Sequence, residues 1–334
     1  MTIKSLKTGI FATAVAASVM AISSQAAIAA PIEIKFSHVV AENTPKGKMA
    51  NRFRDLIKER LGDDKVIVKV FPNKQLYGDG KVLEAMLLGD VELAAPSLSK
   101  FKKYTKKLQL FDLPFLFKNA DAAANFLAGP NGNSLLSSLE SKGLTGLGYL
   151  NNGMKQLSST KKMVVPSDAA GLKFRIMGSD VLQAQFEAVS ATPLKKPFSE
   201  VFTLLQTKAI DGQENTWSNI YSKKFYEVQP YIMDSNHGYL GYLVVTSSEF
   251  WNKIPEEHRS VIKTALDEAI TYGNEVAKEK AVSDRQAIID SGVSTVYSIT
   301  DAERQQWVDI MKPVWKKFED EVGADMIQAA AAQQ

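Results

Sequence analysis

Arg175 is the residue around which the most specific chemistry of this chain can be built. In the run Gly171–Asp180, apolar residues alternate with Lys173 and Arg175, which is the period of a short β-strand. A Gly-Ser-Asp turn follows, and Val181–Val189 then has its apolar residues at helical spacing. In open α/β sheets, crevices for small ligands form where strands end, and a guanidinium there presents a planar fork of donors that matches a carboxylate. The structural alternative is an arginine paired with a buried acid.

Four other side chains, all after residue 150, fit a site for a small anion. Lys155 supplies a point charge with three donors, and Asn215 follows a strand expected at Ile210–Glu214, where its amide can donate to a carboxylate. Trp217 and Phe198 are candidates for the walls of the pocket. A solvated lysine, a turn-forming asparagine and ordinary core aromatics are the structural alternatives.

The first half of the chain offers donors of its own. His38 follows one expected strand and Ser97 follows another, so both are expected at the same edge of a sheet. An imidazole can donate to a carboxylate, although a histidine that caps a helix, or one whose hydrogen bonds are merely satisfied within the protein, is the alternative. The sequence also offers four further polar candidates that it does not order by strength: Lys35, Lys100, Tyr77 and His237.

Catalysis has no local signature in this sequence. It contains no G-x-S-x-G elbow, H-E-x-x-H motif, P-loop or G-x-G-x-x-G motif, and it has no cysteine. The three histidines, His38, His237 and His258, lie far apart and show no metal-ligand spacing. We therefore expect a binding protein and not an enzyme, with no metal and no cofactor.

The elements that must position these residues follow an alternating pattern. Strand and helix periods succeed one another from the start of the folded chain, which predicts an α/β fold with a doubly wound sheet. The expected elements are Ile32–Ser37, a helix opened by Thr44-Pro45 and ended by Gly62, then Val66–Phe71, Val82–Leu88 and Val91–Ala95.

Three later segments predict two lobes, each built from more than one stretch of the chain. Asn151–Gly153 is expected to be a hinge, and the apolar run Tyr239–Thr246 is expected to return as a buried strand to the first lobe. Residues 255–291 keep the helical period and would span roughly 55 Å, so this helix is expected to brace both lobes. A helix that packs on a partner chain is the alternative.

The last predicted helix opens with a capping box, Thr300-x-x-Glu303, and contains Pro313, which should kink it. Its apolar stripe is expected to belong to the core.

The first 29 residues differ in kind from the rest. Lys4 and Lys7 precede a largely apolar run, and Ala27-Ile28-Ala29 is typical of a cleavage site, so we expect a signal peptide that is removed after Ala29 or Ala30. Two of the 40 basic residues lie in this leader, which leaves 38 basic against 37 acidic residues. Such a balance does not indicate nucleic-acid binding.

Three blocks of the sequence together resemble one family. They are Asn152–Leu157, Gly171–Arg175 and Asp211–Trp217. They are similar to the extracytoplasmic solute-binding subunits of tripartite ATP-independent periplasmic (TRAP) transporters of the DctP type, and the resemblance runs from about Ile32 to about Val322. The segments Glu-Asn-Thr-Trp-Ser-Asn and Gly-Ser-Asp-Val-Leu-Gln-Ala-Gln-Phe resemble the C4-dicarboxylate branch. The wider family often has arginine where this chain has Lys155.

The resemblance implies a two-lobed binding protein of the Venus-flytrap kind. Residues 30–153 with 241–280 would form one lobe, and residues 154–240 with 281–334 the other. Malate, succinate or fumarate would bind between the lobes, and the closed protein would deliver it to the small and large membrane subunits of a TRAP transporter. The alternatives are a different carboxylate, such as a 2-oxo acid or a sugar acid, or a periplasmic receptor that serves a sensor.

Overall fold

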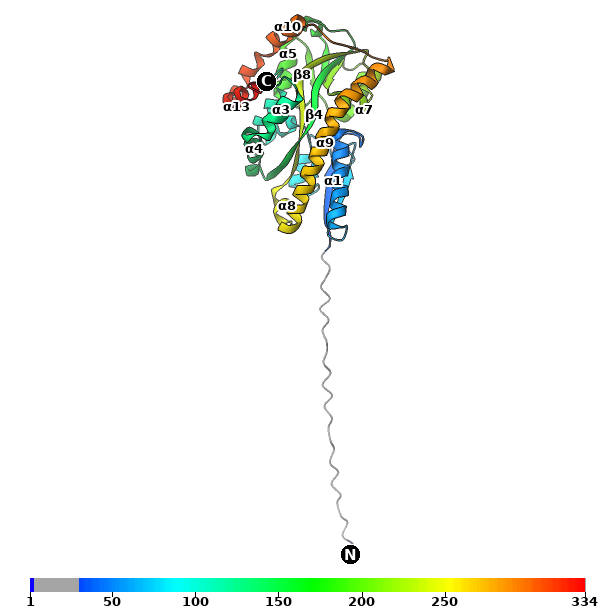
Figure 1. Ribbon diagram of the computed structural model, residues 1–334, viewed down its shortest axis with the longest axis vertical. Helices are drawn as coiled ribbons and strands as arrows, with labels where there is room; N and C mark the ends of the chain where they lie inside the picture. The colour runs from blue at the N-terminus through cyan, green and yellow to red at the C-terminus, as the bar shows by residue number, and fades with distance from the viewer. Residues whose placement is uncertain (3–29, 334) are drawn as a thin grey trace. The chain divides into compact units, whose positions relative to one another are not determined.

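The computed structural model describes residues 1–2 and 30–333 (Figure 1). Pro31–Gln334 form one compact unit, and all elements named below belong to it. The expected signal peptide, apart from Met1 and Thr2, lies outside the described residues. Among the residues that are described, no helix is both long and apolar enough to cross a membrane.

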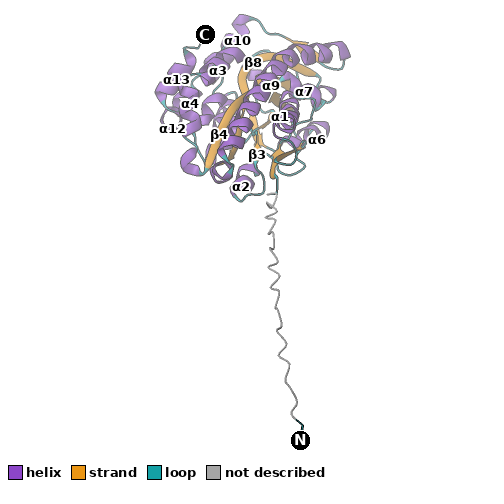
Figure 2. Ribbon diagram, turned by 60° about the horizontal axis from the view of Figure 1, so that its bottom comes forward, coloured by secondary structure: helices purple, strands orange, loops and turns teal. Residues whose placement is uncertain are grey.

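Nine strands form one mixed sheet in the order β2-β1-β3-β8-β4-β7-β5-β6, with β9 paired to β8, and helices cover the sheet (Figure 2). The first half of the sheet consists of β2 (Val66–Phe71), β1 (Ile32–Ser37) and β3 (Leu93–Ala94), and its strands are parallel. The second half consists of β7 (Gly212–Asn215), β5 (Lys173–Ile176) and β6 (Thr192–Lys195), also parallel. The expected α/β sheet is thus confirmed.

Two long antiparallel strands, β4 (Leu144–Ser159) and β8 (Tyr231–Ser247), join the halves of the sheet. Near one end of the pair, β8 bonds to β3; near the other, β4 bonds to β7 and β8 bonds to β9 (Thr295–Tyr297). β4 therefore does not end at the predicted hinge, Asn151–Gly153. It continues through a bulge between Asn151 and Gly153, where Gly153 has a φ of 110° that favours glycine.

Helices occupy the connections between strands. The α-helices before the long helix are α1 (Pro45–Leu61), α2 (Val82–Leu87), α3 (Ala120–Ala128), α4 (Pro130–Ser137), α5 (Asp180–Ala188), α6 (Val201–Gln206), α7 (Trp217–Ser222) and α8 (Ser248–Lys253). Short 3-10 helices include η1 (Leu98–Lys103) and η2 (Lys107–Asp112). Thr44 caps α1 by accepting from Gly47 N, with proline in the first turn, as the sequence predicts.

The long helix α9 (Glu256–Ser291) packs against α1, α7 and β4, and so contacts both halves of the molecule (Figure 1). Its Gly273 lies where a Cβ atom would be 2.7 Å from Leu150 Cδ1 and 2.8 Å from Met49 Cβ. Glycine is therefore required for this close approach of α9 to β4 and α1. The expected bracing role agrees with this packing.

The end of the chain forms four helices: α10 (Asp301–Met311), α11 (Val314–Lys317), α12 (Glu319–Val322) and α13 (Ala324–Ala331). The Thr300–Glu303 capping box forms as predicted. Pro313 does not kink one helix but separates α10 from α11, because proline cannot donate the backbone hydrogen bond that would continue α10. Trp307, Met311 and Val314 are buried, so this part of the stripe joins the core.

Candidate functional site

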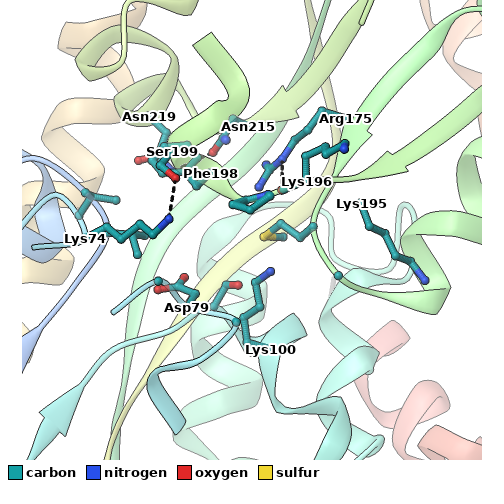
Figure 3. Close-up of a pocket in the computed structure, with 18 of the residues that line it drawn as sticks. Lys74, Asp79, Lys100, Arg175, Lys195, Lys196, Phe198, Ser199, Asn215 and Asn219 are labelled. Atoms are coloured by element: carbon teal, nitrogen blue, oxygen red, sulfur yellow. Dashed lines mark hydrogen bonds between the residues drawn. The ribbon is translucent and has the colours of Figure 1, made fainter. Parts of the chain in front are cut away.

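A cavity of about 330 Å³ lies between the two halves of the sheet (Figure 3). Residues that follow β1 and β3 line it from the first half, and residues of β5, β7 and the segment after β6 line it from the second half. Its volume lies within the range of small-molecule sites, which is roughly 300–1,000 Å³.

Arg175 reaches this cavity from β5, where its side chain is only 2% exposed. Its Nε donates to the backbone oxygen of Lys196 at 2.9 Å, which fixes the plane of the guanidinium. Among the described residues, neither terminal amino group of Arg175 has a hydrogen-bond acceptor or an ion-pair partner. Burial lowers the pKa of Arg175 to about 10, whereas the negative charge of Glu214 acts in the opposite direction and favours the charged guanidinium. A desolvated cation with unused donors therefore faces the cavity.

Phe198 and Asn215 stand beside Arg175. The Phe198 ring lies 5.9 Å from Arg175 Cζ and lines the cavity, as the sequence predicts for a wall. Asn215 Oδ1 accepts from the backbone nitrogen of Thr216 and from Asn219 Nδ2 at 2.8 Å. Since its oxygen is occupied, the amide nitrogen of Asn215 is the group that can donate to a ligand.

Ser97 and Tyr242 form the opposite wall. They pair as an isolated antiparallel bridge, and Tyr242 OH accepts from Asn219 Nδ2 at 3.4 Å. Ser97 Oγ is buried and has no hydrogen-bond partner within residues 30–333. A buried hydroxyl without a partner is costly, so it suits a ligand that supplies one.

His38 follows β1 as expected but does not line the cavity; its neighbours Val39 and Val40 do. Both ring nitrogens are buried and lack partners in the described part of the chain. Burial, together with the charge of Lys46, lowers the pKa of His38 to about 3, so the ring is neutral near pH 7. This histidine can donate to a ligand only as the neutral imidazole.

Lys155 lies beneath the cavity and is not part of its lining. Its Nζ pairs with Glu214 at 2.8 Å, both side chains are 1% exposed, and His237 Nε2 lies 3.0 Å from the same carboxylate. Burial raises the pKa of Glu214, but Lys155 and His237 together outweigh burial and bring it to about 2. Lys155 therefore has a protein carboxylate as its partner, and so does the expected contributor His237.

Trp217 also lies away from the lining. It starts α7 and packs in the apolar cluster that contains Phe225 and Ile232, with Arg285 stacked 5.6 Å from its ring. The core alternative thus describes its position. Of the remaining candidates, Lys35 and Tyr77 form hydrogen bonds to Asp90 and lie outside the cavity. Lys100 lines the cavity.

Sequence reasoning missed five charged residues that line the cavity, Lys74, Asp79, Lys81, Lys195 and Lys196, and also the nearby Lys46. Asp79 and Lys74 line the cavity from the loop after β2. Lys46 is buried in α1, donates to Ala95 O at 2.6 Å and stacks 3.5 Å from the centre of the Tyr242 ring. The first turn of a helix that follows a strand end is a signal that could have pointed to Lys46.

The chemistry available here is the binding of an anion. The described residues contain no group of three or more histidine or acidic side chains that could hold a metal ion. What the cavity does offer is buried cations and unused neutral donors, which suits a carboxylate.

Comparison with known proteins decides the family. The profile of the family described as bacterial extracellular solute-binding protein, family 7 (DctP), matches residues 36–321. This chain belongs to that family. The resemblance found in the sequence is confirmed.

Three similar proteins are named for C4-dicarboxylates or were solved with one bound. The C4-dicarboxylate-binding periplasmic protein DctP of Shewanella loihica is 64% identical over 304 residues, covering 91% of this chain and 90% of the relative. A TRAP periplasmic solute-binding protein from Shewanella oneidensis, solved with bound succinate, is 62% identical with a TM-score of 0.90, covering 91% of this chain and 99% of that chain. One from Pseudomonas aeruginosa, with bound L-malate, is 44% identical with a TM-score of 0.83, covering 86% and 100%.

Proposed function

We propose that this family 7 protein captures a C4-dicarboxylate, such as succinate, malate or fumarate, in the cavity between the two halves of its sheet. The observation that carries the proposal is the buried Arg175, whose two terminal amino groups face the cavity without a partner in the described chain. The similar proteins that hold succinate or L-malate support the choice of a dicarboxylate. The protein acts as a binder and not as an enzyme.

Arg175 binds one carboxylate through its planar fork, and Asn215 donates its amide to the same end of the ligand. Phe198 covers the guanidinium and keeps water from the pair. Ser97, from the other half of the molecule, meets the ligand only when the halves approach each other. Ligand binding therefore favours the closed arrangement.

The closed protein delivers its ligand to the small and large membrane subunits of a TRAP transporter. The chain is exported to the periplasm through the leader 1–29, with cleavage after Ala29 or Ala30. Both statements extend the family assignment to this chain, and a pull-down with the purified membrane subunits tests the first of them.

Calorimetric titration of the mature protein tests the ligand class. Succinate, malate and fumarate should bind, and a panel of 2-oxoglutarate, galactonate, pyruvate and amino acids should bind more weakly. Arg175→Lys should weaken succinate binding about 10- to 100-fold, because the ammonium loses the bidentate fork. Arg304→Lys is the matched control, since Arg304 also stacks on a phenylalanine, at 4.8 Å from Phe115, but lies outside the cavity. Equal affinity in wild type and Arg175→Lys would remove Arg175 from the site.

A further inference from the structure

Lys100 is a second cation that faces the cavity, from the half of the molecule opposite to Arg175 (Figure 3). It lies in η1, which follows β3, whereas Arg175 lies in β5. Its side chain is half-buried, and its Nζ makes no hydrogen bond or ion pair with any described residue. An ammonium withdrawn from water without a partner is unfavourable, so this position suits an anion that arrives from outside.

The other lysines of the cavity are already accounted for. Lys195 pairs with Asp180 at 2.8 Å, and Lys81 pairs with Glu84 at 2.8 Å. Lys74 donates to Ser199 Oγ at 3.4 Å, and Lys196 is exposed to solvent. Lys100 is therefore the lining lysine of the described chain that combines partial burial with an unused ammonium.

Electrostatics and space agree with this assignment. Burial lowers the pKa of Lys100, and the nearby positive charge of Arg175 lowers it further, while Asp79 favours the charged form of both groups. Asp79 is the acidic residue of the lining that both cations share, and a dianion between them supplies further negative charge. A Cβ atom at Gly178, just after β5, would lie 3.6 Å from Lys100 Nζ, so the missing side chain leaves the ammonium open toward the second half.

We infer that Lys100 binds the second carboxylate of the ligand and thereby determines the preference for dicarboxylates over monocarboxylates. Ser97, three residues before Lys100 and with a buried unpartnered hydroxyl, donates to the same carboxylate. The ligand then bridges Arg175 in one half and Lys100 in the other. This inference rests on the proposed function and assigns the part of the site that the sequence left open.

Titration of Lys100→Met with two ligands of equal chain length tests the inference. Succinate carries two carboxylates and butyrate carries one. In Lys100→Met, succinate binding should fall about 10- to 100-fold, the usual effect of losing one hydrogen bond to a charged group, whereas butyrate binding should change less than about threefold. Lys100→Arg should restore most of the succinate affinity. Lys102→Met is the matched control from the same 3-10 helix, because Lys102 pairs with Asp180 and does not line the cavity.

The outcomes separate the inference from the proposed function. Unchanged succinate binding in Lys100→Met, or an equal loss for succinate and butyrate, would overturn the role of Lys100 and leave capture of dicarboxylates intact. Failure of the wild-type protein to bind any dicarboxylate would overturn both. Thermal melting of each variant without ligand shows whether it is folded, and Lys100→Gln replaces Lys100→Met if the apolar side chain impairs folding.

Discussion

Glu214 illustrates how much of this site is held by charges that never touch the cavity. It precedes Asn215 in β7, and its carboxylate is held by Lys155 from β4 and His237 from β8. Ser235 Oγ lies 2.8 Å from the other ring nitrogen of His237, which fixes the ring in place. The three strands that meet below the cavity are thus joined by one buried polar network.

Glu214→Gln should destabilise the protein strongly. The glutamine leaves Lys155 buried without a counter-charge, which costs about 3 to 5 kcal/mol of unfolding free energy. Urea unfolding without ligand measures this loss. Lys263→Met breaks the exposed pair between Lys263 and Asp267 on α9 and should change stability by less than about 0.5 kcal/mol. A similarly small effect in both variants would show that the buried pair is not structurally important.

His38 should make the protein less stable in acid. Its pKa is about 3 in the folded state, against 6.5 as the ordinary value that applies after unfolding. Between these values the unfolded chain binds a proton that the folded chain does not, so stability falls as the pH is lowered from about 6.5 toward 3. At pH 4 this single group removes about 3 kcal/mol.

Urea unfolding of wild type and His38→Gln at pH 7 and pH 4 checks this. The variant should lose about 3 kcal/mol less than wild type between the two values. An equal loss in both proteins would mean that His38 titrates normally in the folded state.

Local sequence patterns could predict some of the site and not the rest. Arg175, Asn215, Ser97 and Phe198 all lie on the cavity. The first three lie at or near the ends of strands whose period is visible in the sequence, whereas no predicted element positions Phe198. Lys155 does not lie on the cavity, because it pairs with Glu214 instead. This pairing could not be predicted, since Glu214 is 59 residues away along the chain and no sequence pattern connects the two. Lys100 was among the candidates, but only its unused ammonium in three dimensions distinguishes it from the other lysines.

At the scale of elements, the long helix α9 is important because it packs closely against β4 and α1. Asn274 Oδ1 accepts from the backbone nitrogen of Asn151 at 2.7 Å, so the helix is attached at the bulge of β4. Gly273 beside it permits the contact with Leu150 and Met49. The helix is thus joined to the crossing strand at the point where the strand changes direction.

Gly273→Ala should destabilise the protein, although the same change in an exposed helix would stabilise it by up to about 1 kcal/mol. The added methyl group has no room against Leu150 and Met49 and should cost about 1 to 3 kcal/mol. Thermal or urea unfolding gives the sign directly. Ser283→Ala, at an exposed position of the same helix, is the control and should stabilise slightly. Stabilisation by Gly273→Ala would contradict the close packing described here.

Most elements were predictable because their apolar residues have a clear period, and α1, α5 and α9 begin or end within one or two residues of expectation. The two crossing strands were predicted only in part. β8 begins at Tyr231, eight residues before the apolar run at Tyr239, because its first part is polar and interrupted by bulges. The pairing with β4 holds that part extended where local propensity is weak.

At the scale of the whole molecule, two exposed contacts cross the cavity beside the buried contact of Asn219 with Tyr242. Lys74 donates to Ser199, and Lys223 donates to Asn73 Oδ1 at 3.1 Å. Exposed polar contacts of this kind contribute little to holding the halves together, so we expect the ligand to supply a large share of the free energy of closing. The lobe boundaries at residues 153/154 and 240/241, which the bulges of β4 and β8 surround, remain our prediction for the axis of this motion.

Succinate should therefore reduce the radius of gyration of the wild-type protein in solution X-ray scattering. The same succinate concentration should not change the radius of Arg175→Lys, which binds too weakly to be saturated. Wild-type protein that binds succinate in calorimetry yet keeps its radius would show that the halves do not move on binding.

The crossing strands also determine when the protein can fold. β3 is completed by a partner that comes 151 residues later, as Ala94 pairs with Val245, and Leu144 of β4 pairs with Ser247. A chain made from its first residue onward therefore holds unpaired strand edges until β8 has emerged. Contacts so distant in sequence close large loops and form slowly. Because β4 and β8 run through both halves, neither half can fold by itself. The nascent protein is therefore exposed to aggregation, and accessible to chaperones, until nearly three quarters of its length has been synthesised.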